Sequence, residues 1–235
     1  MSEFFDVGIT YPWVRPPAEF YSDMPLGAQT TFEAYEGASA VVHTRSGEVD
    51  YALEPFLGDM DIDDGAMKKM WGIKASAKSD IFEVYAGSTN GELDIEPGAA
   101  RAAMTGEGVR VWTLGGNLDY HNIVVYTEYG QSKIDNNPLQ DSKAGYATLG
   151  YRFGKVLPYA TYGLFEQDSG SEQTSTTLGL RYDVTASAAV KVEWQNIDPT
   201  QRTTAIGGEQ PAGLFEDMPA EGDVNVFSAV LNLVF

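Results

Sequence analysis

The spacing of strand-like segments is the feature that most restricts how this chain can fold. Apolar and polar residues alternate in eleven runs, with the period of two expected for a β-strand that has one apolar face. These runs are residues 37–45, 50–58, 67–78, 81–87, 109–120, 123–130, 144–153, 157–165, 175–183, 188–196 and 224–235. Short gaps between the runs, such as residues 79–80 and 121–122, alternate with long gaps, such as residues 88–108 and 198–223. This order predicts an all-β, antiparallel up-and-down sheet with tight turns at one end and long loops at the other.

Charge is sorted between the two ends of this predicted sheet. The chain of 235 residues has 34 acidic and 15 basic residues, which give a formal net charge of −19. The long gaps are residues 59–66, 88–108, 131–143, 166–174 and 198–223, and together they hold 19 acidic residues but only four basic ones. A soluble sandwich has no reason to sort charge in this way. A barrel with one end facing the outside does.

Composition removes several classes of function. The acidic excess argues against a nucleic-acid partner, because phosphate binding needs a basic surface. With no cysteine and only two histidines, the chain lacks thiolate chemistry and the residues of a histidine-rich metal centre. No apolar stretch approaches the ~18–20 residues of a membrane-spanning helix, and the first residues do not form a secretory signal. No cofactor is expected.

Three segments resemble strands of Gram-negative outer-membrane porins. NVFSAVLNLVF (225–235) places an apolar residue at every second position back from a terminal aromatic, and GYATLGYRFGKVLPYATYGLFE (145–166) and TLGLRYDVTASAAVKVEWQ (177–195) look like porin hairpins. The resemblance covers most of the chain from about residue 34 onward. It implies a transmembrane β-barrel as a single domain over residues 1–235, closed by strand 224–235. It also implies that Leu231, Leu233 and Phe235 carry the signal read by the assembly machinery.

The porin resemblance sets an expected strand count. Porins of the sixteen-strand type fold the loop between strands five and six into the barrel. If Phe235 ends strand sixteen, the eleven runs become strands six to sixteen, and residues 12–32 become the inward constriction loop. Strands one to four and a signal peptide would then be missing, with Met1 an internal methionine. The alternative is a twelve-strand barrel that uses residues 1–11 as its first strand, since closed bacterial barrels have an even strand number.

Basic residues on the polar faces are the candidates for the pore. Arg152, Arg181 and Lys191 lie on three of four neighbouring predicted strands and share the polar face. Arg15, Glu19, Asp23 and Glu33 lie on or beside the predicted inward loop. Porins commonly set a basic wall against an acidic loop, and rings of charged side chains bias which ions pass. The resemblance therefore implies that these seven residues form the constriction.

Aromatic residues near the ends of the runs predict where a membrane would lie. They are Trp71, Trp112, Tyr120, Tyr129, Tyr151, Phe153, Tyr159, Tyr182, Trp194 and Phe235. In a soluble sandwich they would belong to the core, whereas in a barrel they would form the two interfacial girdles. Their position close to strand ends favours the girdles.

Two groups of residues resemble chemical sites but fit simpler interpretations. The DMDIDDG run (59–65) fails as an EF-hand, because the sixth and twelfth positions are Asp64 and Met70. It is interpreted as a solvated acidic loop, with weak binding of a divalent ion that bridges lipopolysaccharide left open. A Ser–His–acid lipase would need a histidine next to a serine, but Ser39 and His43 are too far apart along a strand, and His121 lies in a turn. No enzyme is expected.

The sequence thus predicts a porin that lets small hydrophilic solutes and ions diffuse passively across an outer membrane. The acidic excess predicts a mild preference for cations, and the family resemblance implies a homotrimer in contact with lipid and lipopolysaccharide. The alternative is a structural or adhesive barrel, whose acidic loops bind lipopolysaccharide or a partner through divalent cations.

Overall fold

The computed structural model describes residues 36–62, 65–98, 102–168, 172–185, 187–200, 202–203, 209–210 and 222–233. The predicted inward loop 12–32, with Arg15, Glu19 and Asp23, lies outside the described residues, and so do Glu33 and Phe235. No helix in the described ranges is long and apolar enough to span a membrane.

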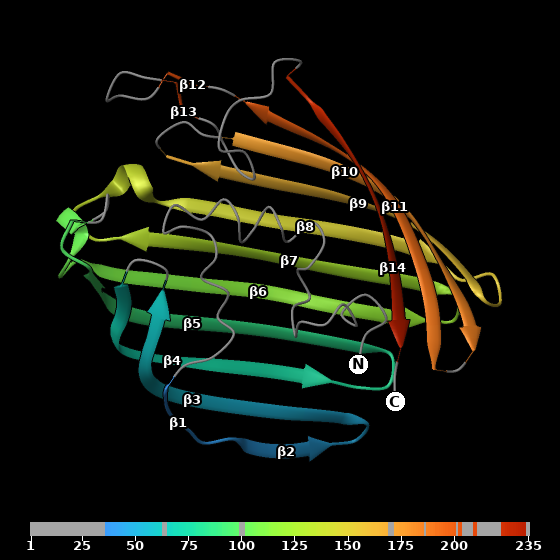
Figure 1. The fold of residues 1–235 in the computed structure, drawn as a ribbon. Helices are drawn as coiled ribbons and strands as arrows, with labels where there is room; N and C mark the ends of the chain where they lie inside the picture. Colours follow the sequence, from blue (N-terminus) through green and yellow to red (C-terminus); the bar gives the residue numbers. More distant parts are fainter. Residues whose placement is uncertain are drawn as a thin grey trace.

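One antiparallel sheet of 12 strands contains most of the described residues, and it follows the order of the chain (Figure 1). Its strands are β1 (Glu36–Ser39), β2 (Val42–Ser46), β3 (Val49–Ile62), β4 (Gly65–Lys78), β5 (Phe82–Ile95), β6 (Gly108–Tyr120), β7 (Ile123–Ile134), β8 (Ser142–Tyr151), β9 (Val156–Gln167), β10 (Glu172–Thr185), β11 (Ala188–Thr200) and β14 (Val224–Leu233). The short strands β1 and β2 both pair with β3. From β3 to β11 each strand pairs with the next one, and β14 pairs with β11. The predicted up-and-down antiparallel topology is confirmed.

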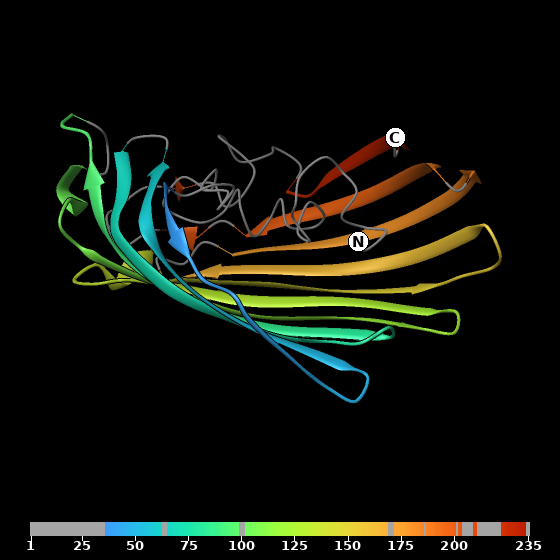
Figure 2. The ribbon, with the colours of Figure 1, turned by 90° about the horizontal axis from the view of Figure 1, so that it is seen from below.

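Three short elements lie in the connections of the sheet. They are the 3-10 helices η1 (Ala102–Met104) and η2 (Pro138–Gln140), and a two-stranded sheet of β12 (Arg202–Thr203) and β13 (Glu209–Gln210). The main sheet curves into a trough, and within the described residues β14 does not pair with β1 or β2 (Figure 2).

Ten of the eleven predicted runs each match one strand, while the run 37–45 is divided into β1 and β2, and several strands extend further at the end with the long loops. β5 continues to Ile95 instead of ending at residue 87, and β3 and β4 are separated only by residues 63–64. The long loop predicted at residues 59–66 is therefore wrong, because pairing continues through Met60–Met67 and Asp61–Ala66. Strands β3, β4, β5 and β10 have 14 residues, more than the ~9–11 that cross a bilayer.

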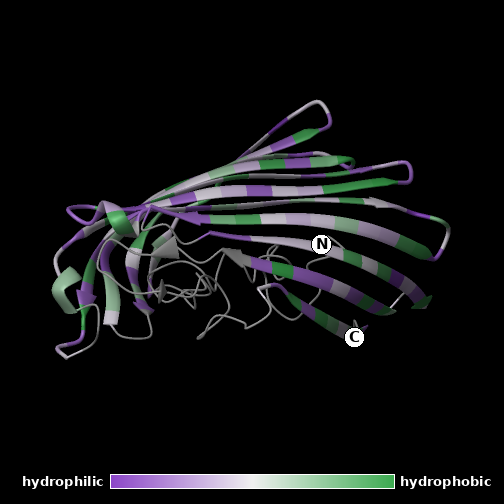
Figure 3. Cartoon of the chain, turned by 90° about the horizontal axis from the view of Figure 1, so that it is seen from above, coloured by the Kyte–Doolittle hydropathy of each residue, from purple (hydrophilic) through white to green (hydrophobic). Residues whose placement is uncertain are grey.

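Hydrophilic and hydrophobic residues alternate along much of the sheet (Figure 3). Large apolar side chains are exposed on the outward face, among them Leu57, Trp71, Leu114, Leu149, Leu178, Val192 and Phe227. Alternating positions on the concave face carry buried polar residues such as Glu128, Thr148, Thr161, Thr177, Lys191 and Gln195. A broad exposed apolar face, with polar side chains buried on the other side, is the reverse of a soluble sandwich.

Digestion of intact cells tests which end of the sheet faces the outside. Added protease is expected to cut within residues 88–108 or 198–223, because the connections at this end of the sheet include the longest ones. The products would be read by mass spectrometry, with lysed cells as the control. Cleavage only at the tight turns, such as residues 121–122, would reverse the orientation.

Candidate functional site

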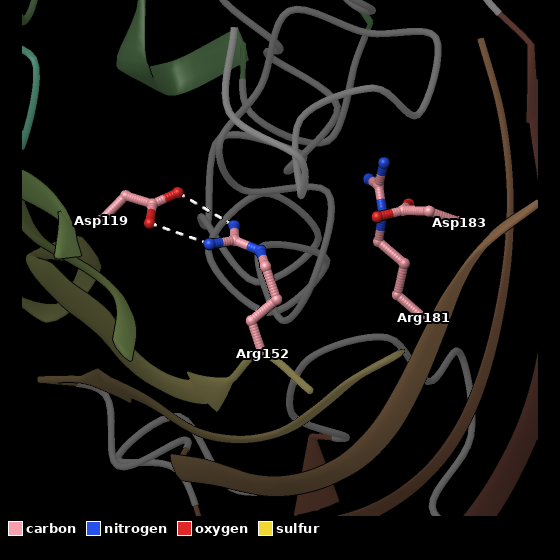
Figure 4. Close-up of polar contacts among 4 residues, drawn as sticks. All are labelled: Asp119, Arg152, Arg181 and Asp183. Atoms are coloured by element: carbon pink, nitrogen blue, oxygen red, sulfur yellow. Dashed lines mark hydrogen bonds and ion pairs between the residues drawn. The ribbon is translucent and has the colours of Figure 1, made fainter. Parts of the chain in front are cut away.

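The concave wall near the tight turns holds the first predicted pore residue, Arg152. It directly follows β8, and its backbone N–H donates to the Asn122 carbonyl oxygen at 2.7 Å. Its guanidinium donates two hydrogen bonds to Asp119 at the end of β6, both at 3.0 Å (Figure 4). Paired donors of this kind fix both side chains and give the strongest type of surface ion pair. Arg152 is therefore held against its own wall by an acid 33 residues earlier in the chain.

Arg181 and Lys191 lie opposite each other on β10 and β11 and point to the same concave face. Arg181 contacts Asp183 on its own strand, with Nε to Oδ1 at 2.8 Å. Lys191 Nζ lies 3.6 Å from a carboxylate oxygen of Glu193, and both side chains are only 2% exposed. Each of the three predicted bases thus has an acid beside it, so this part of the wall is close to charge-balanced.

The three bases lie near one rim of the sheet and not at its middle. Arg152 is flanked by the outward-facing Tyr151 and Phe153, whose rings are 4.7 Å apart. Arg181 precedes the outward-facing Tyr182, which pairs with Val190. Arg152 is therefore at the level of the aromatic side chains at the tight-turn end, whereas Arg181 and Lys191 lie one residue further toward the middle, between Tyr182 and Leu180 on β10 and between Val190 and Val192 on β11.

The middle of the concave wall is polar but uncharged across β8 to β11. Thr148, Thr161, Thr177 and Gln195 oppose one another in register across four strands. The hydroxyls of Thr148 and Thr161 share a hydrogen bond of 2.8 Å. Such a row presents hydroxyl and amide groups without fixed charge.

The concave wall at the long-loop end is apolar, which the sequence did not predict. Nine buried residues pack there: Met60, Met67, Met70, Leu93, Ile95, Met104, Val109, Val111 and Ile134. Met104 belongs to η1, which lies against β5, and the Thr105 hydroxyl donates to the Ile95 carbonyl oxygen at 3.0 Å. The connection after β5 therefore folds onto the inside of the sheet.

Ion pairs between neighbouring strands line the same end. Lys69 contacts Glu92 at 2.6 Å, Arg110 contacts Asp135 at 2.8 Å, and Lys143 contacts Glu166 at 2.7 Å. Pairs this exposed add little stability. No group of three or more metal-ligating side chains converges in the part of the chain that the structure describes.

Aromatic side chains on the outward face mark two levels. Trp71, Trp112 and Phe227 lie toward the long loops, and Tyr120, Tyr151, Phe153 and Tyr182 lie toward the tight turns. At the long-loop level, the indole N–H of Trp112 donates to Gln131, and that of Trp194 donates to Asn225. Rings with a polar tip are typical of the membrane interface.

The structure places Tyr159 on the concave face and Leu231 on the outward face. Tyr159 was expected in a girdle, but it is buried on the concave face, where its hydroxyl donates to Glu193. Leu231, expected to carry the assembly signal, is 61% exposed on the outward face of β14 opposite Val190. Leu233 ends the same strand.

An apolar outward belt with aromatic rims, around a concave face that carries polar side chains beside two buried apolar clusters, is typical of the wall of a transmembrane β-barrel. The sequence profile of Gram-negative porins matches residues 26–201. The chain belongs to the Gram-negative porin family, and it is an outer-membrane β-barrel protein. This family and this fold point to a channel rather than an enzyme.

Solved structures with the same fold are outer-membrane proteins. In-vitro folded OmpT of Vibrio cholerae is 16% identical, with a TM-score of 0.57, and the match covers 89% of this chain and 66% of that one. A trimer form of that protein is 16% identical, with a TM-score of 0.56 and coverages of 90% and 68%. The anion-selective porin from Comamonas acidovorans is 13% identical, with a TM-score of 0.52 and coverages of 82% and 58%.

The first two structures found are both forms of OmpT, and this chain spans 60% and 66% of their lengths. No curated protein matches the sequence.

Proposed function

We propose that this protein is a general-diffusion channel for small hydrophilic solutes and ions. The observation that carries this proposal is the polar, uncharged row of Thr148, Thr161, Thr177 and Gln195 on the concave face, behind an apolar outward belt. Such a wall offers hydrogen bonds to water and polar solutes without selecting a particular one. The work of the channel is passage, and no chemical step is required of it.

A mild preference for cations is the second part of the proposal. The bases Arg152, Arg181 and Lys191 each have an acid partner on their own wall, so they add little net positive field. The acidic excess at the long-loop end raises the local concentration of cations at the mouth. The Comamonas acidovorans neighbour is described as anion-selective, and the charge distribution here favours the opposite sign.

The proposal also includes the residues that form the constriction and the oligomeric state of the protein. Arg15, Glu19, Asp23 and Glu33 would face the basic wall from the segment around residues 12–32. A homotrimer is proposed, in line with the trimer form of one OmpT structure. Contact with lipopolysaccharide would involve the acidic rim.

Removing two of the wall bases tests whether the wall lines a conducting path. The double variant Arg152→Ser and Arg181→Ser loses two positive charges and leaves Asp119 and Asp183 without these partners. Single-channel conductance in planar bilayers should rise, and the reversal potential in a salt gradient should move toward stronger cation preference.

Arg110→Ser is the matched control, because Arg110 is an exposed arginine paired with Asp135 at the opposite rim. It should change the conductance much less. If the wild-type protein does not conduct at all, the channel function itself is wrong. If the wild-type protein conducts and the double variant has the same conductance and reversal potential, these arginines do not line the path.

A further inference from the structure

A three-residue bridge crosses the concave wall between β9 and β11. Tyr159 on β9, Gly179 on β10 and Glu193 on β11 oppose one another in register. The tyrosine ring lies over Gly179, so closely that a Cβ atom added there would overlap the ring. The Tyr159 hydroxyl then donates to Glu193 Oε1 at 2.5 Å, two strands from its own.

The same arrangement recurs between β5 and β7. Tyr85 on β5, Gly115 on β6 and Glu128 on β7 are in register, and the Tyr85 ring occupies the space where Gly115 would carry a Cβ. Its hydroxyl donates to Glu128 Oε2 at 2.7 Å. Glu128 is 3% exposed, so its carboxylate is held within the wall. A third ring, Phe56 on β3, covers Gly72 in the same way but has no hydroxyl group to donate.

We propose that Tyr85 and Tyr159 are positioning residues that fix the carboxyl groups of Glu128 and Glu193 in the channel wall, and that Glu193 acts there as an immobile negative charge. Each glycine leaves a path for the ring, each ring spans one strand, and each hydroxyl holds a carboxylate. The function of this charge rests on the proposed channel, but the bridges themselves do not depend on it.

The Glu193 bridge is the more constrained of the two. Its second carboxylate oxygen accepts from Ser228 on β14 at 3.3 Å, and Lys191 lies 3.6 Å away. Donors from β9 and β14 thus hold one charge on β11. The carboxylate of Glu193 accepts a hydrogen bond from a phenol hydroxyl. A hydrogen bond to a charged acceptor is stronger than one between neutral groups. Loss of the hydroxyl would remove a donor that favours the charged form of Glu193 and holds it in place, so less negative charge would act on ions that pass.

The test removes single groups from the β9–β11 bridge in the refolded chain. Tyr159→Phe keeps the ring and deletes the hydroxyl, and Gly179→Ala blocks the path of the ring. Tyr162→Phe is the matched control for the first, because Tyr162 is on the same strand but is 52% exposed on the outward face. Gly87→Ala is the control for the second, since an added Cβ there would meet only ordinary contacts.

Two measurements are made on each variant. In planar bilayers, Tyr159→Phe, Gly179→Ala and Glu193→Gln should each move the reversal potential toward anions, with the largest shift for Glu193→Gln, and both controls should match wild type. In urea unfolding, the effects of Tyr159→Phe and Glu193→Ala should be coupled. Either single variant already loses the hydrogen bond between the two residues, so the double variant loses nothing further from it. The decrease in the folding constant of the double variant should therefore be roughly tenfold smaller than the product of the two single decreases.

The outcomes separate the bridge from the channel. A wild-type chain that does not conduct refutes the proposed function, and the unfolding coupling still decides whether the bridge exists. Coupling without any shift of the reversal potential refutes the positioning role, since the bridge would then only stabilise the wall. Absence of coupling refutes the bridge.

Discussion

Replacing Val192 by arginine is expected to abolish most of the insertion of this protein into a membrane. Val192 is 46% exposed on the outward face of β11, between Leu180 on β10 and Ala229 on β14. It lies in the middle of the apolar band, since Val190 pairs with Tyr182 on one side and Trp194 follows on the other. A charged residue facing lipid near the bilayer centre costs about 2–4 kcal/mol. The variant should therefore fold into liposomes roughly 30- to 1000-fold less favourably.

Asn196→Arg provides the control for depth. Asn196 is on the same strand and the same face, but beyond Trp194, where it donates to Asp223 at 2.7 Å. Arginine near the interface costs only about 0–1 kcal/mol. Urea titration in liposomes and the heat-modifiable gel shift would measure both variants. Equal losses for the two would mean that the outward face of β11 does not lie against lipid.

The strands themselves were predictable because their two faces differ in polarity. In β10, Leu178, Leu180 and Tyr182 alternate with Thr177, Gly179 and Arg181, and the structure exposes the first set on the outward face. Period-two alternation specifies both the strand and its orientation, since a slip of one residue would turn every apolar side chain inward.

The apolar mouth was not predictable because a β-bulge in β4 breaks the alternation. The pairing of β4 with both neighbouring strands shifts there, and Lys69 in the bulge has a φ of 52°. The shift turns Met67 inward with Met70, although simple alternation would put the two on opposite faces. Tyr159 was misplaced for another reason: in β9 the residues of both faces are largely apolar or aromatic, so alternation gives no orientation.

The candidate site was predictable only in its local parts. Alternation was enough to put Arg152, Arg181 and Lys191 on the polar face. The pairing of Arg181 with Asp183 and of Lys191 with Glu193 also follows from the sequence, because residues two apart on a strand share a face. The pairing of Arg152 with Asp119 does not, since it depends on how distant segments come together in the sheet.

Truncation of Leu93 should weaken the long-loop end more than any change to its exposed ion pairs. Leu93 is 1% exposed within the apolar cluster of the concave wall. Its backbone also ties down the following connection, since Leu93 N–H donates to the Glu107 carbonyl oxygen and the Leu93 carbonyl oxygen accepts from Gly106 N–H. Deleting a buried leucine side chain costs about 2–5 kcal/mol. Leu93→Ala should lower the urea midpoint and expose residues 96–107 to protease.

Leu139→Ala is the control for this prediction, because Leu139 is a leucine of η2 at the same end but is 40% exposed. A surface truncation of this kind usually changes stability by less than about 0.5 kcal/mol. If both variants lose the same stability, the apolar cluster does not act as a core. A large loss for Leu93→Ala alone would mean that the mouth is built on its own packed core. The channel would then narrow at that end because of packing, whereas the charges near the tight turns would influence which ions pass.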